Sequence, residues 1–341
     1  MKLIDTEDAL DEVLTHPRTT LVEFIKTLSS PLVILGAGGK MGPTLCVLAH
    51  RAAEAAAHPL EVIAVSRFSD EHTRRWLEAR GVQTLTCNLL DRTLLAQLPD
   101  SENVVYLVGL KFGTAHNPAR TWALNTLVPA HAAERYPRAR IAVLSSGNVY
   151  PLREIRSGGS VESDPLTPLG EYANACVARE RLFEFYAQQN NTPIVNIRLN
   201  YAVELRYGVL LDIARKVWAD EPVDVTMGYL NCIWQGDAND MILRSFVLAA
   251  APAQPLNLTG PDMLSIRSLA QRFGELLGKS PAITGIEAET ALLNNPARAC
   301  SLLGPPPTPP GTMMRWVAHW LQMGGRQLGK PTHFETRTGS Y

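Results

Sequence analysis

A glycine-rich segment that joins an apolar run to a helical pattern constrains this chain more than any other feature. The run at residues 32–35 leads into Gly36-Ala37-Gly38-Gly39-Lys40-Met41-Gly42, and a helical pattern covers residues 43–57. Glycines suit such a turn because a pyrophosphate must approach the backbone closely, and the helix N-terminus then offers free N–H groups. The order of strand, turn and helix predicts a dinucleotide site rather than a glycine-rich turn without a ligand. The predicted cofactor contacts in this turn are Gly36, Gly39, Lys40, Met41 and Gly42.

Short apolar runs alternate with helical patterns over the first 200 residues. Strands are expected at residues 32–35, 62–65, 82–86, 104–108, 141–144 and 194–199, and helices at 43–57, 71–79, 92–98, 119–136 and 172–189. This alternation requires crossover connections and a parallel sheet that is buried on both faces. We therefore predict an α/β protein with a Rossmann-type, doubly wound parallel sheet.

The domain organisation follows from where this alternation begins and weakens. Residues 1–30 carry two short helical patterns, which predict a helical N-terminal extension before a dinucleotide-binding domain at 31–200. From about residue 201 helical patterns dominate, so residues 201–325 are expected to form a smaller, mostly helical substrate domain. Residues 326–341 are expected to be a C-terminal tail.

Composition excludes several classes of protein. Hydrophobic residues make up 46% of the chain and charged residues 19%, and 32 basic residues balance 33 acidic ones. This balance predicts no attraction to nucleic acid or to anionic membranes. The five cysteines lack paired spacing, which argues against a disulfide framework or a zinc site. With no signal peptide and no long apolar run expected, the sequence predicts a cytoplasmic protein without a bound metal.

The end of the second expected strand bears on the choice of cofactor. A site that prefers NAD usually places Asp or Glu here to bind the ribose 2′-hydroxyl group. This chain has Ser66 and Arg67, which remove the carboxylate and offer a cation to a 2′-phosphate group. The sequence therefore favours NADP, and the alternative is a permissive NAD site beside a surface arginine.

Further motifs appear in an order that resembles the extended short-chain dehydrogenase/reductase family, which includes nucleotide-sugar epimerases and dehydratases. The resemblance covers about residues 31–322. It rests on the glycine turn, on the segments 87–91, 108–111 and 144–150, and on the run from Glu162 through Tyr172 to Glu180. It implies hydride transfer to or from a nicotinamide, and a homodimer formed through the helices at 119–136 and 172–189.

The resemblance also implies roles for individual residues. Tyr172 would act as the acid/base, and Ser146 would hydrogen-bond the reacting oxygen. Asn88 and Leu89 fall in the segment that contacts adenine, and Gly109 falls at the exit of the fourth strand.

One departure from the family pattern concerns catalysis. A lysine four residues after the tyrosine would lower the pKa of the phenol, which is about 10 without a nearby cation. Here that position is Cys176. Three interpretations stay open: Lys111 approaches Tyr172 from the fourth-strand exit, the chemistry demands less of the tyrosine, or the protein binds the cofactor without turnover.

A second departure concerns the substrate. Leu230 falls at or near the place of an arginine that holds the diphosphate of nucleotide sugars in the family. Since phosphate recognition depends on charge-assisted contacts, a smaller polyhydroxylated substrate such as a sugar or sugar acid is favoured. The candidate substrate residues are Asn148, Asn200, Arg206 and Trp234. Arg198 fits either the sugar site or a helix-to-strand salt bridge.

Two functions are therefore compatible with the sequence. The first is an NAD(P)-dependent oxidoreductase or epimerase that acts on a sugar, sugar acid or similar small molecule by hydride transfer. The alternative is a non-catalytic NAD(P)-binding sensor or regulatory protein of the same fold. A cation close to Tyr172 would favour the enzyme.

Overall fold

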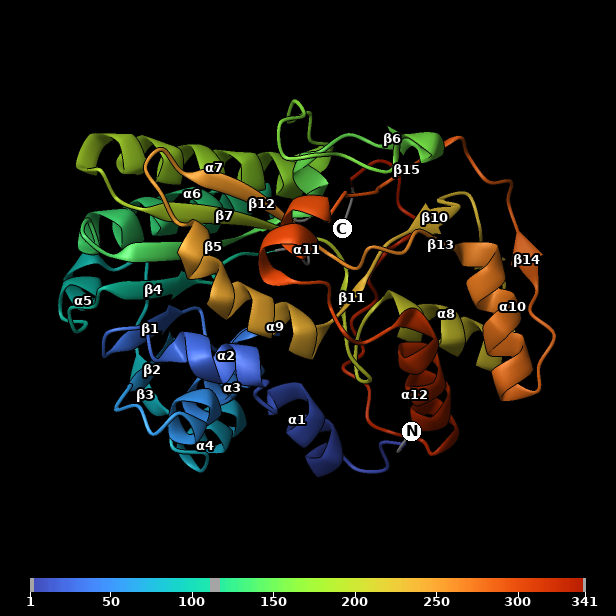
Figure 1. Ribbon diagram of the computed structural model, residues 1–341. Helices are drawn as coiled ribbons and strands as arrows, with labels where there is room; N and C mark the ends of the chain where they lie inside the picture. Colours follow the sequence, from blue (N-terminus) through green and yellow to red (C-terminus); the bar gives the residue numbers. More distant parts are fainter. Residues whose placement is uncertain (1–2, 111–116, 340–341) are drawn as a thin grey trace.

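A seven-stranded parallel sheet forms the centre of the computed structural model, which describes residues 3–110 and 117–339 (Figure 1). The strand order is β12-β7-β5-β4-β1-β2-β3. The strands are β1 (Leu32–Leu35), β2 (Val62–Ser66), β3 (Gln83–Thr86), β4 (Asn103–Tyr106), β5 (Arg140–Ser146), β7 (Ile194–Leu199) and β12 (Gln254–Leu258). The predicted α/β fold with a Rossmann-type sheet is confirmed, although the sequence analysis did not identify β12.

Helices cover both faces of this sheet. One layer contains α5 (Arg92–Ala96), α6 (Pro118–Arg135) and α7 (Gly170–Asn190). The other contains α2 (Thr19–Ile25), α3 (Gly42–Ala55) and α9 (Gln235–Arg244), with α4 (Glu71–Glu78) beside α3. Figure 1 shows α6 and α7 packed together, with α9, α2 and α3 grouped apart from them.

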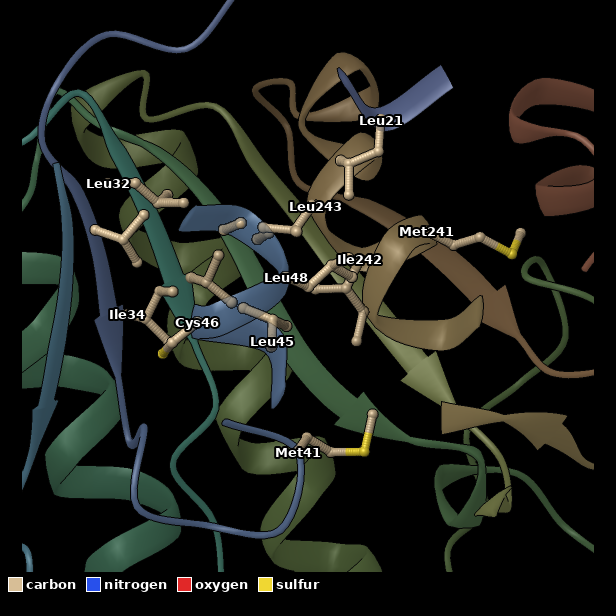
Figure 2. Close-up of a cluster of buried hydrophobic side chains, with 14 of the residues drawn as sticks. Leu21, Leu32, Ile34, Met41, Leu45, Cys46, Leu48, Met241, Ile242 and Leu243 are labelled. Atoms are coloured by element: carbon tan, nitrogen blue, oxygen red, sulfur yellow. The ribbon is translucent and has the colours of Figure 1, made fainter. Parts of the chain in front are cut away.

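Strand β1 shows why both faces are covered. All four of its residues are buried, and successive side chains enter different cores. Leu32 and Ile34 pack with α3 and α9 (Figure 2), whereas Val33 and Leu35 belong to the core beneath α6 and α7. An unbroken apolar run at this position is therefore the mark of a central parallel strand.

The second half of the chain builds a smaller region around its own core. Its helices are α8 (Val209–Trp218), α10 (Ile266–Leu277) and α12 (Pro310–Gln322). The short strands are β6 (Arg153–Glu154), β8 (Ala202–Val203), β9 (Val223–Asp224), β10 (Tyr229–Leu230), β11 (Ile233–Trp234), β13 (Leu264–Ser265), β14 (Ile283–Thr284) and β15 (Thr290–Ala291). The elements of the range 201–325 that return to the central sheet domain include α9, β12 and α11 (Ala297–Leu303), whose buried residues Ala299 and Leu303 belong to the sheet core.

The N-terminal extension is helical and connects the two regions. Helix α1 (Glu7–Thr15) contacts α3 and α9, while Leu10 and Leu14 are buried in the core of the smaller region. Within residues 3–110 and 117–339, no helix is long and apolar enough to cross a membrane. The same residues contain no group of three side chains that could hold a metal ion.

Candidate active site

The glycine turn after β1 has a geometry that only glycine permits at two positions. Gly36 adopts φ +86°, and a Cβ atom there would lie 2.9 Å from the backbone nitrogen of Val108. A Cβ atom at Gly42 would lie 2.3 Å from the carbonyl oxygen of Ala37. At Gly39 a Cβ atom would lie 3.4 Å from the Gly36 carbonyl oxygen, an ordinary contact distance, so this position tolerates a small side chain.

Helix α3 begins directly after this turn. Its N-cap residue, Met41, makes no side-chain capping hydrogen bond within the described structure, and Pro43 occupies the first turn. The turn therefore faces N–H groups that the helix itself cannot satisfy, which suits an anionic pyrophosphate.

The side chains of Lys40 and Met41 contact other parts of the protein. The Lys40 Nζ atom donates a hydrogen bond of 2.6 Å to the carbonyl of Ala202 and lies 3.8 Å from the centre of the Tyr207 ring. Lys40 thereby links the turn to the smaller region. The side chain of Met41 is buried in the core shown in Figure 2.

The ends of β2 and β3 carry the other predicted cofactor residues. Ser66 is half-buried, and a Cβ atom at Gly38 would lie 2.6 Å from its Oγ atom, so the turn and β2 approach closely. Arg67 is exposed beside it. Asn88 is exposed and its Oδ1 atom accepts a hydrogen bond of 3.3 Å from the Leu90 N–H group, while Leu89 is buried.

Ser146 and Tyr172 lie together at the carboxyl end of the sheet. Ser146 ends β5, Tyr172 lies in the first turn of α7, and their side chains are hydrogen-bonded. The Ser146 Oγ atom also donates to Oδ1 of Asn148 at 3.0 Å. Since β5, β4 and β1 are adjacent and parallel, this pair lies at the same sheet edge as the glycine turn.

The environment of Tyr172 favours its protonated form. Burial raises the pKa of the phenol, and the neighbouring Cys176 acts in the same direction. The positive charge of Arg179 opposes this rise without overcoming it. Tyr172 is therefore a proton donor at neutral pH. Lys111, the cation expected from the sequence, lies outside the described residues.

Arg179 is a feature that the sequence analysis missed. Its side chain is buried, and its Nη1 atom donates to the Leu144 carbonyl at 2.6 Å. Its Nη2 atom donates to Oδ1 of Asn125. The available signal was the spacing: Arg179 follows Tyr172 by seven residues, which places both on one face of a helix.

A chain of asparagines borders the same loop on the side of the smaller region. The Asn200 Nδ2 atom donates to Oδ1 of Asn231 at 3.0 Å, and Asn231 donates to the backbone carbonyl of Asn294. The Asn294 side chain is fully buried, and neither of its polar atoms has a partner among the described residues. A Cβ atom at Gly147 would lie 2.6 Å from the Asn294 Oδ1 atom, so this carboxamide lies against the residue that follows Ser146.

Two sequence-based assignments to the substrate pocket need correction. Arg206 forms ion pairs with Glu204, Asp11 and Glu7, because α1 brings two carboxylates to it from the start of the chain. Trp234 is 2% exposed and packs against Trp316 with ring centres 5.2 Å apart. Both side chains are engaged in holding the smaller region together, so we leave them out of the substrate set.

Arg198 forms the helix-to-strand salt bridge that was one of its two interpretations. Its guanidinium pairs with Glu180 of α7 at 2.8 Å, and both side chains are almost fully buried. Ser145 also donates to Glu180. This network fixes α7 against β5 and β7, and so fixes Tyr172 relative to Ser146.

The chain resembles one protein family in sequence and several solved structures in fold. Residues 32–203 match the model of the NAD dependent epimerase/dehydratase family. No curated protein matches the chain. Among solved structures, the UDP-glucose 4-epimerase of Thermotoga maritima with UDP-glucose is similar with a TM-score of 0.68 and 15% identity, over 86% of this chain and 99% of that one.

Two further structures show the same similarity. The UDP-glucuronic acid 4-epimerase of Bacillus cereus in complex with NAD has a TM-score of 0.71 and 17% identity, over 86% of this chain and 96% of that one. The dTDP-glucose 4,6-dehydratase of Streptomyces venezuelae, with NAD bound, has a TM-score of 0.70 and 16% identity, over 86% and 97%. At these identities the similarity concerns the fold.

Proposed function

Because the chain belongs to the NAD-dependent epimerase/dehydratase family, we propose that it transfers hydride between a nicotinamide dinucleotide and a carbinol or carbonyl carbon of a polyhydroxylated small molecule. The observation that carries this proposal is the hydrogen-bonded pair Ser146 and Tyr172 at the sheet edge that also holds the glycine turn. In parallel α/β sheets, ligands bind at this edge.

The residues of the turn fit a dinucleotide. Gly36 and Gly42 lie where a Cβ atom would clash with backbone, so the turn is tight. The helix N-terminus that follows has no side-chain cap from Met41, and together they provide a cradle for a pyrophosphate. When bound, the nicotinamide supplies or accepts the hydride. Ser66, Arg67, Asn88, Leu89 and Gly109 complete the proposed cofactor set.

The chain's own residues supply the proton chemistry in this proposal. The Tyr172 hydroxyl donates a proton to the substrate oxygen when a carbonyl is reduced, and accepts it in the opposite direction. Ser146 hydrogen-bonds the same oxygen. In the structure the Ser146 hydroxyl donates its one proton to Asn148 Oδ1 at 3.0 Å, so a bond to the substrate oxygen requires this hydroxyl to rotate.

We propose a sugar, sugar acid or similar compound as the substrate rather than a nucleotide sugar. Leu230 is buried in the core of the smaller region and offers no charge to a diphosphate. The unpartnered carboxamide of Asn294, together with Asn200, offers donors and acceptors suited to hydroxyl groups. The structures of similar fold include one with UDP-glucose, so this choice distinguishes the present chain from that protein.

A non-catalytic NAD(P)-binding protein is the second candidate. The observation that favours it is the environment of Tyr172, where burial raises the pKa of the phenol and Cys176 lies at the position one turn further along α7. This candidate predicts cofactor binding without turnover on any carbonyl compound.

Replacing Gly39 by Asp tests the cofactor site. A carboxylate there would repel the pyrophosphate, so we expect NAD and NADP binding to be lost in calorimetry. Gly39→Ala is the matched control, because the nearest atom to its Cβ would be at an ordinary distance of 3.4 Å and φ is not positive. Unchanged affinity in a folded Gly39→Asp variant would remove the proposed site.

Replacing Arg67 by Ala tests the proposed preference for NADP. We expect the affinity for NADP to fall by about 1–3 kcal/mol, which is typical of a lost hydrogen bond to a charged group, and the affinity for NAD to change little. Calorimetric titration with both cofactors measures the difference. Equal losses for the two cofactors would contradict a contact between Arg67 and the 2′-phosphate.

We also propose a homodimer formed through α6 and α7, which pack on each other at the outside of the sheet (Figure 1). The exposed large apolar residues of these two helices are Leu127 and Phe185, with exposed fractions of 51% and 56%, and Trp122, with 38%. Val128 and Phe183 lie on the same two helices but are buried in the core, so they add nothing to this surface. Light scattering should give the mass of a dimer, and Phe185→Asp should give a monomer; a monomeric parent chain at micromolar concentration would reject the proposal.

A further inference from the structure

Arg179 carries a buried positive charge close to the proposed acid/base residue. Its side chain is 4% exposed, and its guanidinium is held from two sides. Nη1 donates to the Leu144 carbonyl of β5, and Nη2 donates to Asn125 of α6. These bonds fix the head group between α6, α7 and the sheet, so its charge has a defined position.

The exit of β4 is shaped to admit this guanidinium. A Cβ atom at Gly109 would lie 2.6 Å from the Arg179 Nη2 atom, so the absence of a side chain at Gly109 allows the close approach. Since β4 lies between β1 and β5, the charge is at the sheet edge that holds both the glycine turn and Ser146. The Arg179 Nε atom has no hydrogen-bond partner in the described part of the chain.

The surroundings of Tyr172 show what this charge acts on. Tyr172, Cys176 and Arg179 follow one another at i, i+4 and i+7 on α7, which places them on one helix face. Ser146 of β5 hydrogen-bonds the phenol, and Tyr106 of β4 faces Arg179. Burial raises the pKa of Tyr172, Cys176 adds to the rise, and Arg179 opposes both. A nearby cation favours a phenolate, and a thiol at position 176 cannot do so.

We infer that Arg179 supplies the positive charge that Tyr172 needs for proton transfer, and that it acts through Tyr172 as a positioning residue. The guanidinium comes from one turn beyond Cys176 and takes the place that Lys111 was expected to fill. This inference rests on the acid/base role of Tyr172 in the proposed function. It assigns the charge to a residue that is always protonated, so the assistance does not depend on pH.

The test measures the phenolate character of Tyr172 directly. Tetranitromethane nitrates tyrosine through the phenolate, and peptide mass spectrometry reports the nitration rate of Tyr172 against Tyr229 as an internal reference. All variants carry Cys176→Ser or Cys176→Lys, so that thiol oxidation at this position does not compete. In the Cys176→Ser background, Arg179→Gln removes the charge and Arg179→Lys retains it.

We expect Arg179→Gln to slow the nitration of Tyr172 by about tenfold or more at mildly alkaline pH, which corresponds to about one pKa unit. Arg179→Lys should remain near the parent rate, and Cys176→Lys should restore the rate in the Arg179→Gln background. Equal rates in all variants, or equal losses with Gln and Lys, would overturn the inference and leave Arg179 as a structural tie.

The design separates this inference from the proposed function. Nitration requires neither cofactor nor substrate, so its outcome does not depend on whether Gly39→Asp abolishes cofactor binding. If Arg179→Gln does not fold, the double variant Cys176→Lys/Arg179→Gln carries the test: a rate at or above that of the parent supports control by charge, and a tenfold loss overturns it.

Discussion

Replacing Tyr172 by Phe is expected to lower kcat for hydride transfer by about 10²–10⁴-fold, the usual contribution of acid/base assistance. The ring stays in place, but the proton donor that Ser146 contacts is removed. Substrate is found first by screening sugars and sugar acids for oxidation or reduction of the nicotinamide. The affinity for the cofactor should remain within a few tenths of a kcal/mol of the parent value, since the hydroxyl lies at the proposed reacting centre rather than in the glycine turn.

The pH dependence provides a second measurement on the same variant. Burial holds the pKa of Tyr172 above its usual value, so the phenol is protonated throughout the neutral range. Reduction of a carbonyl, which needs the protonated phenol, should therefore keep its rate as pH rises through neutrality, and fall only above the raised pKa. Oxidation needs the phenolate and should become faster over the same interval.

A full rate in Tyr172→Phe would show that the family mechanism does not operate in this protein. Ser146→Ala serves as the companion variant, because it removes the second hydrogen bond to the same oxygen and should lower kcat in the same direction. If both variants bind cofactor and neither loses activity, the non-catalytic candidate or a different proton donor takes precedence.

Local patterns were sufficient to predict the sheet domain. The apolar run 32–35, the glycine turn and the following helix are determined by residues close in the chain, and the structure places them as expected. The positions of Ser146 at the end of a strand and of Tyr172 at the start of a helix were also predictable, because each lies in a motif whose neighbours define that element; their catalytic roles remain a proposal.

Features that depend on distant parts of the chain could not be predicted in this way. Strand β12 contains Pro255 and joins the sheet only after the chain has passed through the smaller region. Arg206 resembles a pocket residue until α1 brings Glu7 and Asp11 to it across nearly 200 positions. In both examples, contacts with residues far away in the sequence determine the structure, and no local motif reveals them.

The cation near Tyr172 illustrates the same limit at the candidate site. The sequence pointed to position 176, because it lies four residues after Tyr172, and to Lys111, because it follows the fourth strand. Arg179 becomes visible only when the helix face is combined with Asn125 of α6 and the close approach at Gly109. No motif surrounds Arg179, so its position near Tyr172 is evident only from the packing of α6, α7 and the end of β4.

Replacing Arg198 by Met is expected to destabilise the protein by about 3–5 kcal/mol, which is the usual effect of removing one partner of a buried ion pair. Arg198 and Glu180 have side-chain exposures of 4% and 0%, and the guanidinium also donates to the Tyr150 hydroxyl. Without it, the Glu180 carboxylate would remain buried with Ser145 as its only other side-chain partner in the described chain. Urea unfolding of parent and variant measures the difference.

Arg181→Met is the matched control for this substitution. Arg181 is 61% exposed on the same helix as Glu180 and pairs with Glu184 at 2.6 Å, so its loss should cost below about 1 kcal/mol because solvent screens exposed pairs. The double variant Glu180→Met/Arg198→Met should be more stable than the sum of the two single losses predicts, because no unpaired charge remains buried. Additive losses in this cycle, or an Arg198→Met variant as stable as Arg181→Met, would show that the pair does not hold α7 against the sheet. The Arg179–Leu144 hydrogen bond and the contact with Ser146 would then position Tyr172.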